Sequence, residues 1–421
     1  MAGPGHVTTT RIAIECLPAW QRDIWRPEEK AMAETYAWYG DSYYTNRKEL
    51  GPYVELWDGS TPGAFEGVRE RKHYGHEIDY WESFFMDYWE KVMAYYFRRI
   101  SDWLAAGDVH SAAQCAGTVS HHIADIGFPP HSPDEGDLEY IKDFFPPPEG
   151  FECFPLHGYI ESLPIGPCSI ADYRPRLLGL TAEHAASNLM DSMVSLVRSA
   201  RALMVPLMNA VYSDRLDTIQ VLLGQNVCDA ARVLADFMHT AACLAAGRFD
   251  DQAVEQLKVL RLTWRWPYRM SAFAPHPYGD PSTNAPLRLS GYNLNKDQRR
   301  ARCELLVGTN GGVKSQSFDE ALGAGAYFEY HYRAAAQMYS RFKAWVGIHA
   351  TLGSQRNIDA EVKLDGQTAF KGVLVPGKAA LEVDIDARGC HDIQLISSGP
   401  QYFHPDGSNN NVVWAQPRLE R

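Results

Sequence analysis

The spacing of apolar residues changes once along this chain, near Trp266, and this change limits the fold more than any other feature. Before it, apolar residues recur at helical spacing over long stretches, most clearly 84–106, 181–212 and 216–246, with a shorter stretch at 250–264. After it, short runs with strand-like alternation are separated by turn signals. Such a pattern predicts a helical domain followed by a separate layered β domain.

The β region has the pattern of a sandwich. Asp365-Gly366 lies between two strand-like runs and is a hairpin signal. The segment before the first such run is rich in Pro, Gly, Ser and Asn, which is typical of a linker. We therefore predict a mainly α domain, a linker that leads into the β domain, and a C-terminal β-sandwich, over residues 1–266, 267–299 and 300–421 respectively.

Composition narrows the class of protein. The chain has 421 residues, 45% of them hydrophobic, and a formal net charge of −12. This length suffices for a large first domain and a smaller second one. The acidic balance does not favour nonspecific binding to nucleic acid, although a local cationic metal site still attracts phosphate. No run of about 18 apolar residues occurs, so we expect no transmembrane helix.

The eight cysteines lie far apart and form no Cys-x-x-Cys motif, which argues against a thiolate zinc finger. Cys153 and Cys168 flank a Pro-rich loop, and we expect them to pair if the protein is exported. The other cysteines are expected to be free and buried. The first residues show neither the basic nor the apolar region of a signal peptide, so either the protein is cytoplasmic or a leader was replaced by a start codon.

One stretch concentrates residues that bind metals. His121 and Asp125 are four residues apart, so both point from one face of a helix, and His157 and Glu161 repeat this spacing on a second helix. His131 lies between the two pairs. Neutral imidazole and carboxylate are ligands that zinc takes. Two such pairs with a further ligand between them predict a polynuclear zinc site.

The local sequence explains how these residues are presented. Asp108 can cap a helix whose apolar stripe leads to His121 and Asp125 in its last turns. Gly127 and Pro129-Pro130 end that helix and hold His131 on a fixed loop. His122 faces away from His121, and we expect it to support the site or to lie in the core.

This motif resembles the zinc-dependent phospholipase C superfamily, which includes the fungal single-strand nucleases. The family signature has a His, an Asp four residues later, and a His ten after the first with a Pro before it. His121, Asp125, Pro129 and His131 match this signature. A later His-x-x-x-Glu or His-x-x-x-Asp also belongs to the family. The resemblance implies a helical catalytic domain that holds three zinc ions.

Upstream residues are similar to the rest of the family's ligand set. They are Asp41 in Trp38-Tyr-Gly-Asp41, His73 in Lys72-His73-Tyr-Gly-His, and His6 near the N-terminus. His76 and Asp58 are competing candidates. The family normally begins with a Trp whose main-chain amino and carbonyl groups bind a metal. This chain has Met1 there, whose main-chain atoms offer the same ligands.

The resemblance assigns these residues to three sites. One zinc would bind Asp41, His73 and His121, with Asp125 as a bridge. A second would bind His131, His157 and Glu161. The third would bind Asp125, His6 and the main chain of Met1.

The implied activity is hydrolysis of a phosphoric ester, most directly a phosphodiester, by a metal-activated water. Asp125 would bridge two ions, and Asp41 would orient the attacking water. The substrate stays open among a phospholipid, a nucleic acid and a sugar phosphodiester, because Ser42-Tyr43-Tyr44 stands where the nucleases place an Arg. Two alternatives remain: the same cluster acting on a glycan-related substrate, and a non-catalytic glycan-binding protein that zinc stabilises.

The C-terminal region resembles the NPCBM carbohydrate-binding module family, a galactose-binding-like jelly roll attached to secreted glycan-active enzymes. The residues that carry this are Gly308-Thr309, Ser340 to Gly347, Asp365-Gly366, and Val413-Trp414-Ala415 with the following Pro417-Arg418-Leu419. The resemblance implies glycan binding and a secreted or periplasmic location. Trp414 and Tyr402 either stack on a sugar or belong to the core, and a sandwich that only supports the helical domain is the alternative.

Overall fold

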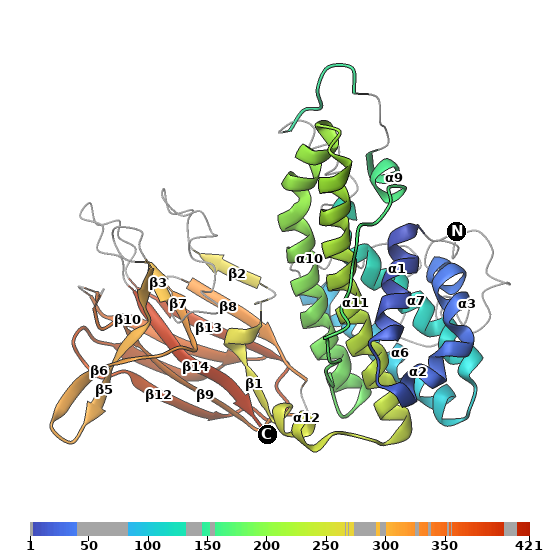
Figure 1. Ribbon diagram of the computed structural model, residues 1–421. Coiled ribbons are helices and arrows are strands. Elements are labelled where there is room, and N and C mark those ends of the chain that lie inside the picture. The colour runs from blue at the N-terminus through green and yellow to red at the C-terminus, as the bar shows by residue number, and fades with distance from the viewer. Residues whose placement is uncertain are drawn as a thin grey trace. The chain divides into compact units, whose positions relative to one another are not determined.

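We describe the protein from a computed structural model. It describes residues 3–39, 83–131, 145–151, 156–265, 267, 269–272, 292–294, 300–324, 328–335, 338–351, 353–354, 356–399 and 411–421. At 83–89, 156–157, 269–272, 292–294 and 300–301 the description covers the backbone alone. The chain forms two compact units, Met1–Val254 and Glu255–Arg421. The first is helical and the second is an antiparallel β-sandwich, which confirms the predicted fold class (Figure 1). The predicted boundaries at 266 and 299 stay a prediction.

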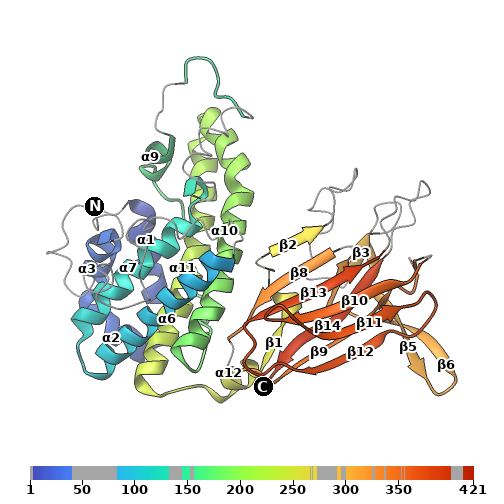
Figure 2. The same ribbon diagram turned by 180° about the vertical axis from the view of Figure 1, so that it is seen from behind.

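Four long helices, α6, α7, α10 and α11, form the frame of the helical unit. The predicted helices at 84–106, 181–212 and 216–246 are present within one or two residues of those bounds. Helices α10 and α11 run side by side and pack against α6 and α7 (Figures 1 and 2). The described α-helices, the last of which lies at the end of the unit, are α1 (Pro4–Glu15), α2 (Ala19–Trp25), α3 (Glu29–Glu34), α6 (Ser83–Ala105), α7 (Val109–Gly127), α9 (Leu156–Glu161), α10 (Ala182–Tyr212), α11 (Leu216–Ala246) and α12 (Asp251–Gln256). Short 3-10 turns lie at η1 (Arg26–Glu28), η2 (Tyr36–Trp38) and η6 (Pro129–His131).

Local side chains set the ends of the helices that matter for the site. Asp108 caps α7 by accepting a hydrogen bond from the Ser111 amide at 3.0 Å, as its position predicts. Gly247 ends α11 in the left-handed conformation, at φ 59°.

By length and composition alone, α10 is apolar enough to cross a membrane. Half of its most apolar window is buried inside the unit, as expected of a core helix.

One helix prediction was wrong. The stretch 250–264 was expected to be a single helix, but α12 ends at Gln256 and β1 (Val259–Arg261) follows it. β1 pairs antiparallel with β14 (Val412–Glu420), from Val259 opposite Glu420 to Arg261 opposite Arg418. Pairing with a strand at the far end of the chain overrides the local helical spacing, because helix propensity is a weak preference that tertiary contacts outweigh.

The C-terminal unit consists of two five-stranded sheets and two short hairpins. One sheet has the order β1-β14-β9-β12, with β7 also paired to β14, and the other has the order β11-β10-β13-β8-β2. Every strand pair among the described residues is antiparallel. The remaining strands are β2 (Arg269–Ala272), β3 (Tyr292–Leu294), β4 (Arg300–Arg302), β5 (Glu304–Thr309), β6 (Gly312–Ser317), β7 (Ala321–Ala324), β8 (Phe328–Arg333), β9 (Arg341–Ile348), β10 (Ile358–Leu364), β11 (Gln367–Leu374), β12 (Leu381–Asp386) and β13 (Asp392–Ser398).

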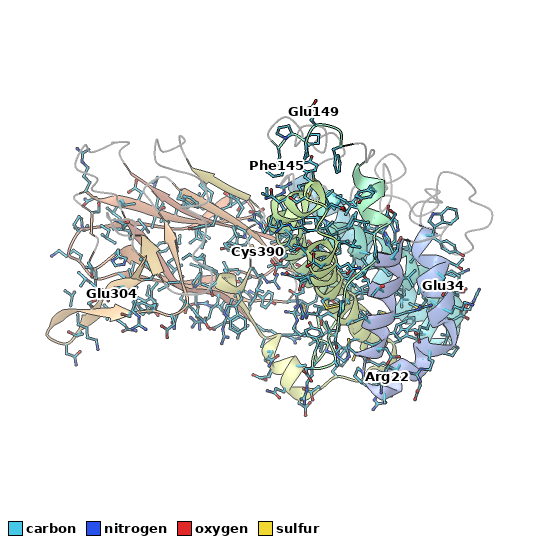
Figure 3. All side chains as sticks on the ribbon, turned by 45° about the horizontal axis from the view of Figure 1, so that its top comes forward. Arg22, Glu34, Phe145, Glu149, Glu304 and Cys390 are labelled. Atoms are coloured by element: carbon cyan, nitrogen blue, oxygen red, sulfur yellow. A yellow bond between two sulfur atoms is a disulfide. The ribbon has the colours of Figure 1, made fainter. Side chains whose placement is uncertain are left out.

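The core of this unit consists of the inward side chains of the two sheets, drawn with all described side chains in Figure 3. Trp414, Tyr330 and Phe342 are among its largest fully buried side chains. Trp414 therefore belongs to the core and is not available to stack on a sugar, whereas Tyr402 lies outside the described residues. Asp365 and Gly366 join β10 to β11 with φ angles of 49° and 78°, which confirms the predicted hairpin.

The cysteine prediction needs a correction. Cys168 forms a disulfide with Cys228 of α11, with the two Cα atoms 5.7 Å apart, so it does not pair with Cys153. Cys153 itself lies outside the described residues. Proximity along the chain misled the prediction, because the segment after α9 runs back along α11. Gly166 N donates to the Gln220 carbonyl and Leu178 N donates to Thr240 Oγ1, so this segment follows α11 over much of its length.

Candidate metal centre

Asp125, in the last turns of α7, lies at the centre of a buried group of histidines. Its Oδ1 is 3.2 Å from His6 Nε2, and its Oδ2 is 3.0 Å from His121 Nε2. His131 Nε2 lies 3.8 Å from Oδ1. All four side chains are at least nine-tenths buried. The two oxygens of one carboxylate thus face histidines that come from different elements, which is the arrangement a bridging carboxylate needs.

His121 is oriented by the backbone of η2. Its Nδ1 lies 2.8 Å from the carbonyl oxygen of Ala37, which can only accept, so Nδ1 carries the proton. Nε2 then turns a lone pair toward Asp125 Oδ2. Two acceptors 3.0 Å apart require a proton or a cation between them. A metal-binding histidine typically donates its second ring nitrogen to a carbonyl in this way.

Gly117 makes the contact between His121 and the Ala37 carbonyl possible. Gly117 lies one turn before His121 on the same face of α7, where η2 packs against the helix. A Cβ on Gly117 would lie 2.3 Å from Tyr36 Cβ and 3.0 Å from the Tyr36 carbonyl carbon. Only a residue without a side chain lets η2 approach so closely, and this approach places Ala37 beside His121.

His6 reaches the cluster from the N-terminal helix. Pro4 is the first residue of α1, a position where its missing amide hydrogen costs nothing. The His6 ring stacks on the His121 ring, with 4.9 Å between centroids and 13° between planes. Glu161, at the end of α9, places Oε1 3.6 Å from His6 Nε2. Gly3 also lies against Glu161, because a Cβ there would be 2.9 Å from Oε1.

The donor set fits zinc. Donor atoms of His6, His121 and Asp125 all lie within 4.8 Å of one another. Zinc bonds of about 2.0–2.2 Å in tetrahedral geometry place two ligand atoms roughly 3.4 Å apart. The four pairwise separations here, 3.2, 3.0, 3.6 and 3.8 Å, lie around that value. Two kinds of donor that zinc accepts therefore converge at the spacing a shared ion requires.

The electrostatics of the cluster keep Asp125 ionised. Burial by itself would raise the pKa of Asp125, but the charges of His121, His131 and His6 and the hydrogen bond with His121 hold its pKa well below the ordinary value of 3.8. An ionised carboxylate is the form that binds a metal. Asp125 is thus ready to act as a ligand at any pH at which histidines are neutral.

The structure brings together some of the predicted site residues. His6, His121 and Asp125 form one group, with Glu161 beside His6 and His131 near Asp125. His131 lies in η6 and not on an open loop, and His122 is buried beside His121, at 5.7 Å between ring centroids. Three predicted ligands, Met1, Asp41 and His73, lie outside the described residues, as does the side chain of His157 on α9.

A cavity of about 30 Å³ adjoins the cluster. His6 and Glu161 form its polar edge, and Asn226 of α11 is another polar lining residue. Apolar side chains form most of the rest, among them Phe128, Ile160 and Leu223. Sequence reasoning missed Asn226, because a single amide in a long amphipathic helix carries no spacing signal.

The segment that follows Glu161 is fastened to α11 by a second polar group that sequence reasoning missed. Asp236 is fully buried and accepts hydrogen bonds from Tyr173 Oη and from the backbone and side chain of Arg176, at 2.7–2.8 Å. Together with the Cys168–Cys228 disulfide, these contacts limit how far the end of α9 can move from α11.

The C-terminal unit is similar to a known domain family. Residues 292–420 match the NPCBM/NEW2 domain. This match covers strands β3 to β14 and leaves β1, β2 and the helical unit outside it. No curated protein matches the chain.

Solved structures show similarities at low identity. The alpha toxin from Clostridium absonum is 11% identical, with 93% of this chain and 84% of that chain covered and a TM-score of 0.32. The alpha-toxin of Clostridium perfringens avian strain SWCP is 13% identical, with 98% and 86% covered and a TM-score of 0.32. CBM51 from Clostridium perfringens GH95, solved in complex with methyl-galactose, is 20% identical over 38% of this chain and 99% of that chain, with a TM-score of 0.30.

Proposed function

We propose that the helical unit is a zinc-dependent hydrolase of phosphoric esters, and that its reaction is phosphodiester hydrolysis. The observation that carries this proposal is the position of Asp125, whose two carboxylate oxygens face His6 and His121 at 3.2 and 3.0 Å inside a buried pocket of histidines. A carboxylate with both oxygens directed at separate imidazoles is suited to hold two cations close together. Clustered cations are typical of sites that hydrolyse phosphodiesters.

His6, His121 and Asp125 would hold zinc, with His131 and Glu161 as neighbouring ligands. The proposed set also includes His157, Asp41, His73 and the main chain of Met1, which would complete three sites. Bound zinc lowers the pKa of a coordinated water and neutralises phosphoryl oxygens.

The chain's own residues supply the rest of the chemistry. Most of the ligands are neutral imidazoles, so the loaded cluster keeps a positive charge that attracts a phosphate group. The carbonyl of Ala37 holds the tautomer of His121, and burial excludes bulk water from the donor atoms. Asp41 is proposed to orient the attacking water.

Metal analysis tests the site directly. Purified protein should contain zinc, three ions if the full set of ligands forms, and Asp125→Asn should lose more metal than any single His→Ala variant because Asp125 serves two ions. His110→Ala is the matched control, since His110 is an exposed histidine that pairs with Glu28 at the surface. An Asp125→Asn protein with the metal content and rate of the wild type would overturn the assignment.

Substrate assays separate this proposal from its rivals. Bis-nitrophenyl phosphate, phosphatidylcholine and single-stranded DNA would each report phosphodiester hydrolysis that a chelator abolishes and added zinc restores. Turnover of a glycan instead would mean that the same cluster cleaves a different bond. A zinc-loaded protein that turns over none of these would be a binding protein in which zinc is structural.

A second function, glycan binding, is favoured for the C-terminal unit by its NPCBM/NEW2 match. Binding of the full chain to a panel of immobilised glycans tests it, with competition by the free sugar as the specificity control. The Cys168–Cys228 disulfide supports an exported protein, because disulfides persist in oxidising compartments. We therefore propose a secreted or periplasmic enzyme that acts near glycans.

A further inference from the structure

Two polar groups at the cavity beside the metal cluster have no part in the proposed function: the carboxamide of Asn226, and Nδ1 of His6, whose other ring nitrogen is the proposed zinc ligand. Asn226 is 3% exposed, and neither Oδ1 nor Nδ2 of its carboxamide has a hydrogen-bond partner within the described part of the chain. His6 is 8% exposed, and its Nδ1 also has no hydrogen-bond partner among the residues described. Both residues line the same cavity. Buried polar groups are nearly always hydrogen-bonded, so a pair of exceptions at one cavity needs an explanation.

Helices α1 and α11 bring these two groups to the same cavity. α1 packs against α11, and a Cβ on Gly5 would meet Val227 Cγ2 at 4.0 Å. Gly5 and Val227 are the chain neighbours of His6 and Asn226. The His6 ring directs Nε2 toward Asp125 and Glu161, at 3.2 and 3.6 Å, so Nδ1 lies on the other edge of the ring.

The role of His6 as a ligand sets a requirement on Nδ1. Nε2 can bind a metal only through its lone pair, so the proton of neutral His6 must be on Nδ1. That N–H needs an acceptor, just as His121 Nδ1 has the carbonyl of Ala37. A carboxamide offers both an acceptor and donors. A water needs roughly 10–15 Å³ of such space, so the cavity of about 30 Å³ admits about two waters.

We propose that Asn226 is the positioning residue of His6: its carboxamide accepts, through water held in the cavity, the hydrogen bond of His6 Nδ1 and so keeps Nε2 as the metal-binding atom. This rests on the proposed function, because it requires His6 to be a zinc ligand. Asn226 itself does not touch the metal.

Zinc affinity of the full chain, measured by competition with a chromophoric chelator, tests the proposal. Asn226→Leu keeps about the same volume and removes the carboxamide. It should weaken binding of at least one zinc by about 10–100-fold, the usual effect of losing a partner behind a metal ligand. Ser187→Ala is the matched control. Ser187 is also buried with its hydroxyl unpartnered in the described structure, but it does not line the cavity, so its loss should leave zinc affinity unchanged.

The thermal midpoint of the metal-free protein distinguishes positioning from simple support of the fold. Asn226→Leu should have a midpoint close to that of the wild type, because the carboxamide makes no direct hydrogen bond within the described part of the chain. A lower midpoint together with weaker zinc binding would indicate a structural role and overturn the proposal. If Asn226→Leu does not unfold cooperatively, Asn226→Ala is judged by the same two measurements.

The outcomes separate the two hypotheses. A wild-type protein that binds no zinc would overturn the proposed function and this inference with it. A wild type that binds zinc, and an Asn226→Leu protein that binds it equally well, would overturn this inference alone.

Discussion

His6 Nε2 and Asp125 Oδ1 lie 3.2 Å apart, although His6 belongs to the first helix of the chain and Asp125 to the last turns of α7. The pair joins the N-terminal segment to the motif that carries most of the other donors. The proposed metal ligands come from separate helices, so they meet only when those helices pack correctly. If they bind zinc as proposed, stability and metal binding should be linked in this unit.

The acid stability of the metal-free protein should depend on Asp125. Its folded-state pKa is held well below 3.8, so the ionised carboxylate stabilises the fold above about pH 3.8, and this contribution is lost as the pH falls through the lower folded-state value. In that pH range Asp125→Asn should lower the free energy of unfolding by about 3–5 kcal/mol, since it removes one member of a buried group of paired ionisable side chains.

Chemical denaturation of metal-free wild type and Asp125→Asn between pH 2 and pH 6 measures this effect. The difference between the two proteins should be largest at the upper end of this range and should shrink toward pH 2. A difference that does not change with pH would mean that Asp125 contributes by packing and not by charge.

Gly117→Ala should disturb His121 without touching it. The added Cβ would lie 2.3 Å from Tyr36 Cβ, so η2 must move away from α7 and carry the carbonyl of Ala37 with it. We expect a loss of about 1–3 kcal/mol in stability from this overpacking, and weaker zinc binding as well. Gly308→Ala is the control, because a Cβ there meets nothing within 4 Å. Unchanged zinc affinity in Gly117→Ala would show that the contact with Ala37 is dispensable.

The disulfide should contribute to the stability of the helical unit. Cys168 and Cys228 close a loop over a sequence separation of 60 residues, and replacing both with Ser should cost about 2–4 kcal/mol. Urea denaturation with and without reductant measures this, since reductant should reproduce the effect of the double substitution. Cys16→Ser, at a free cysteine, should keep the stability of the wild type and the same sensitivity to reductant. Equal midpoints for oxidised and reduced wild type would contradict the prediction.

Two tryptophans of the C-terminal unit, Trp414 and Trp264, should behave differently. Trp414 is fully buried between the sheets, so Trp414→Ala should destabilise the unit by about 3–5 kcal/mol. Trp264 is 62% exposed with Arg261 over its ring, so Trp264→Ala should change stability little. Denaturant titration followed by circular dichroism compares them. A large loss for the exposed residue, or a small one for the buried residue, would contradict the burial described here.

Much of the architecture was predictable because it depends on local spacing. Helix geometry places His121 and Asp125 on one face whatever surrounds them, and the long apolar stripes of α10 and α11 are typical of core helices. The Asp365-Gly366 hairpin likewise follows from the conformations that these two residues accept. The mainly α unit and the β-sandwich were therefore evident from the sequence, as were the donor types of the proposed metal centre.

The tertiary structure decided which distant groups meet. Cys168 pairs with Cys228 because the segment after α9 follows α11, and 259–261 is a strand because β14 lies beside it. The role proposed for Asn226 depends on α1, which places His6 on the same cavity. Short-range periodicity fixes the direction of a side chain on its own element, but the packing of one element on another determines what that side chain faces. The sequence alone thus determined the kinds of ligand, and the packing of α1, α7 and η2 determined their partners.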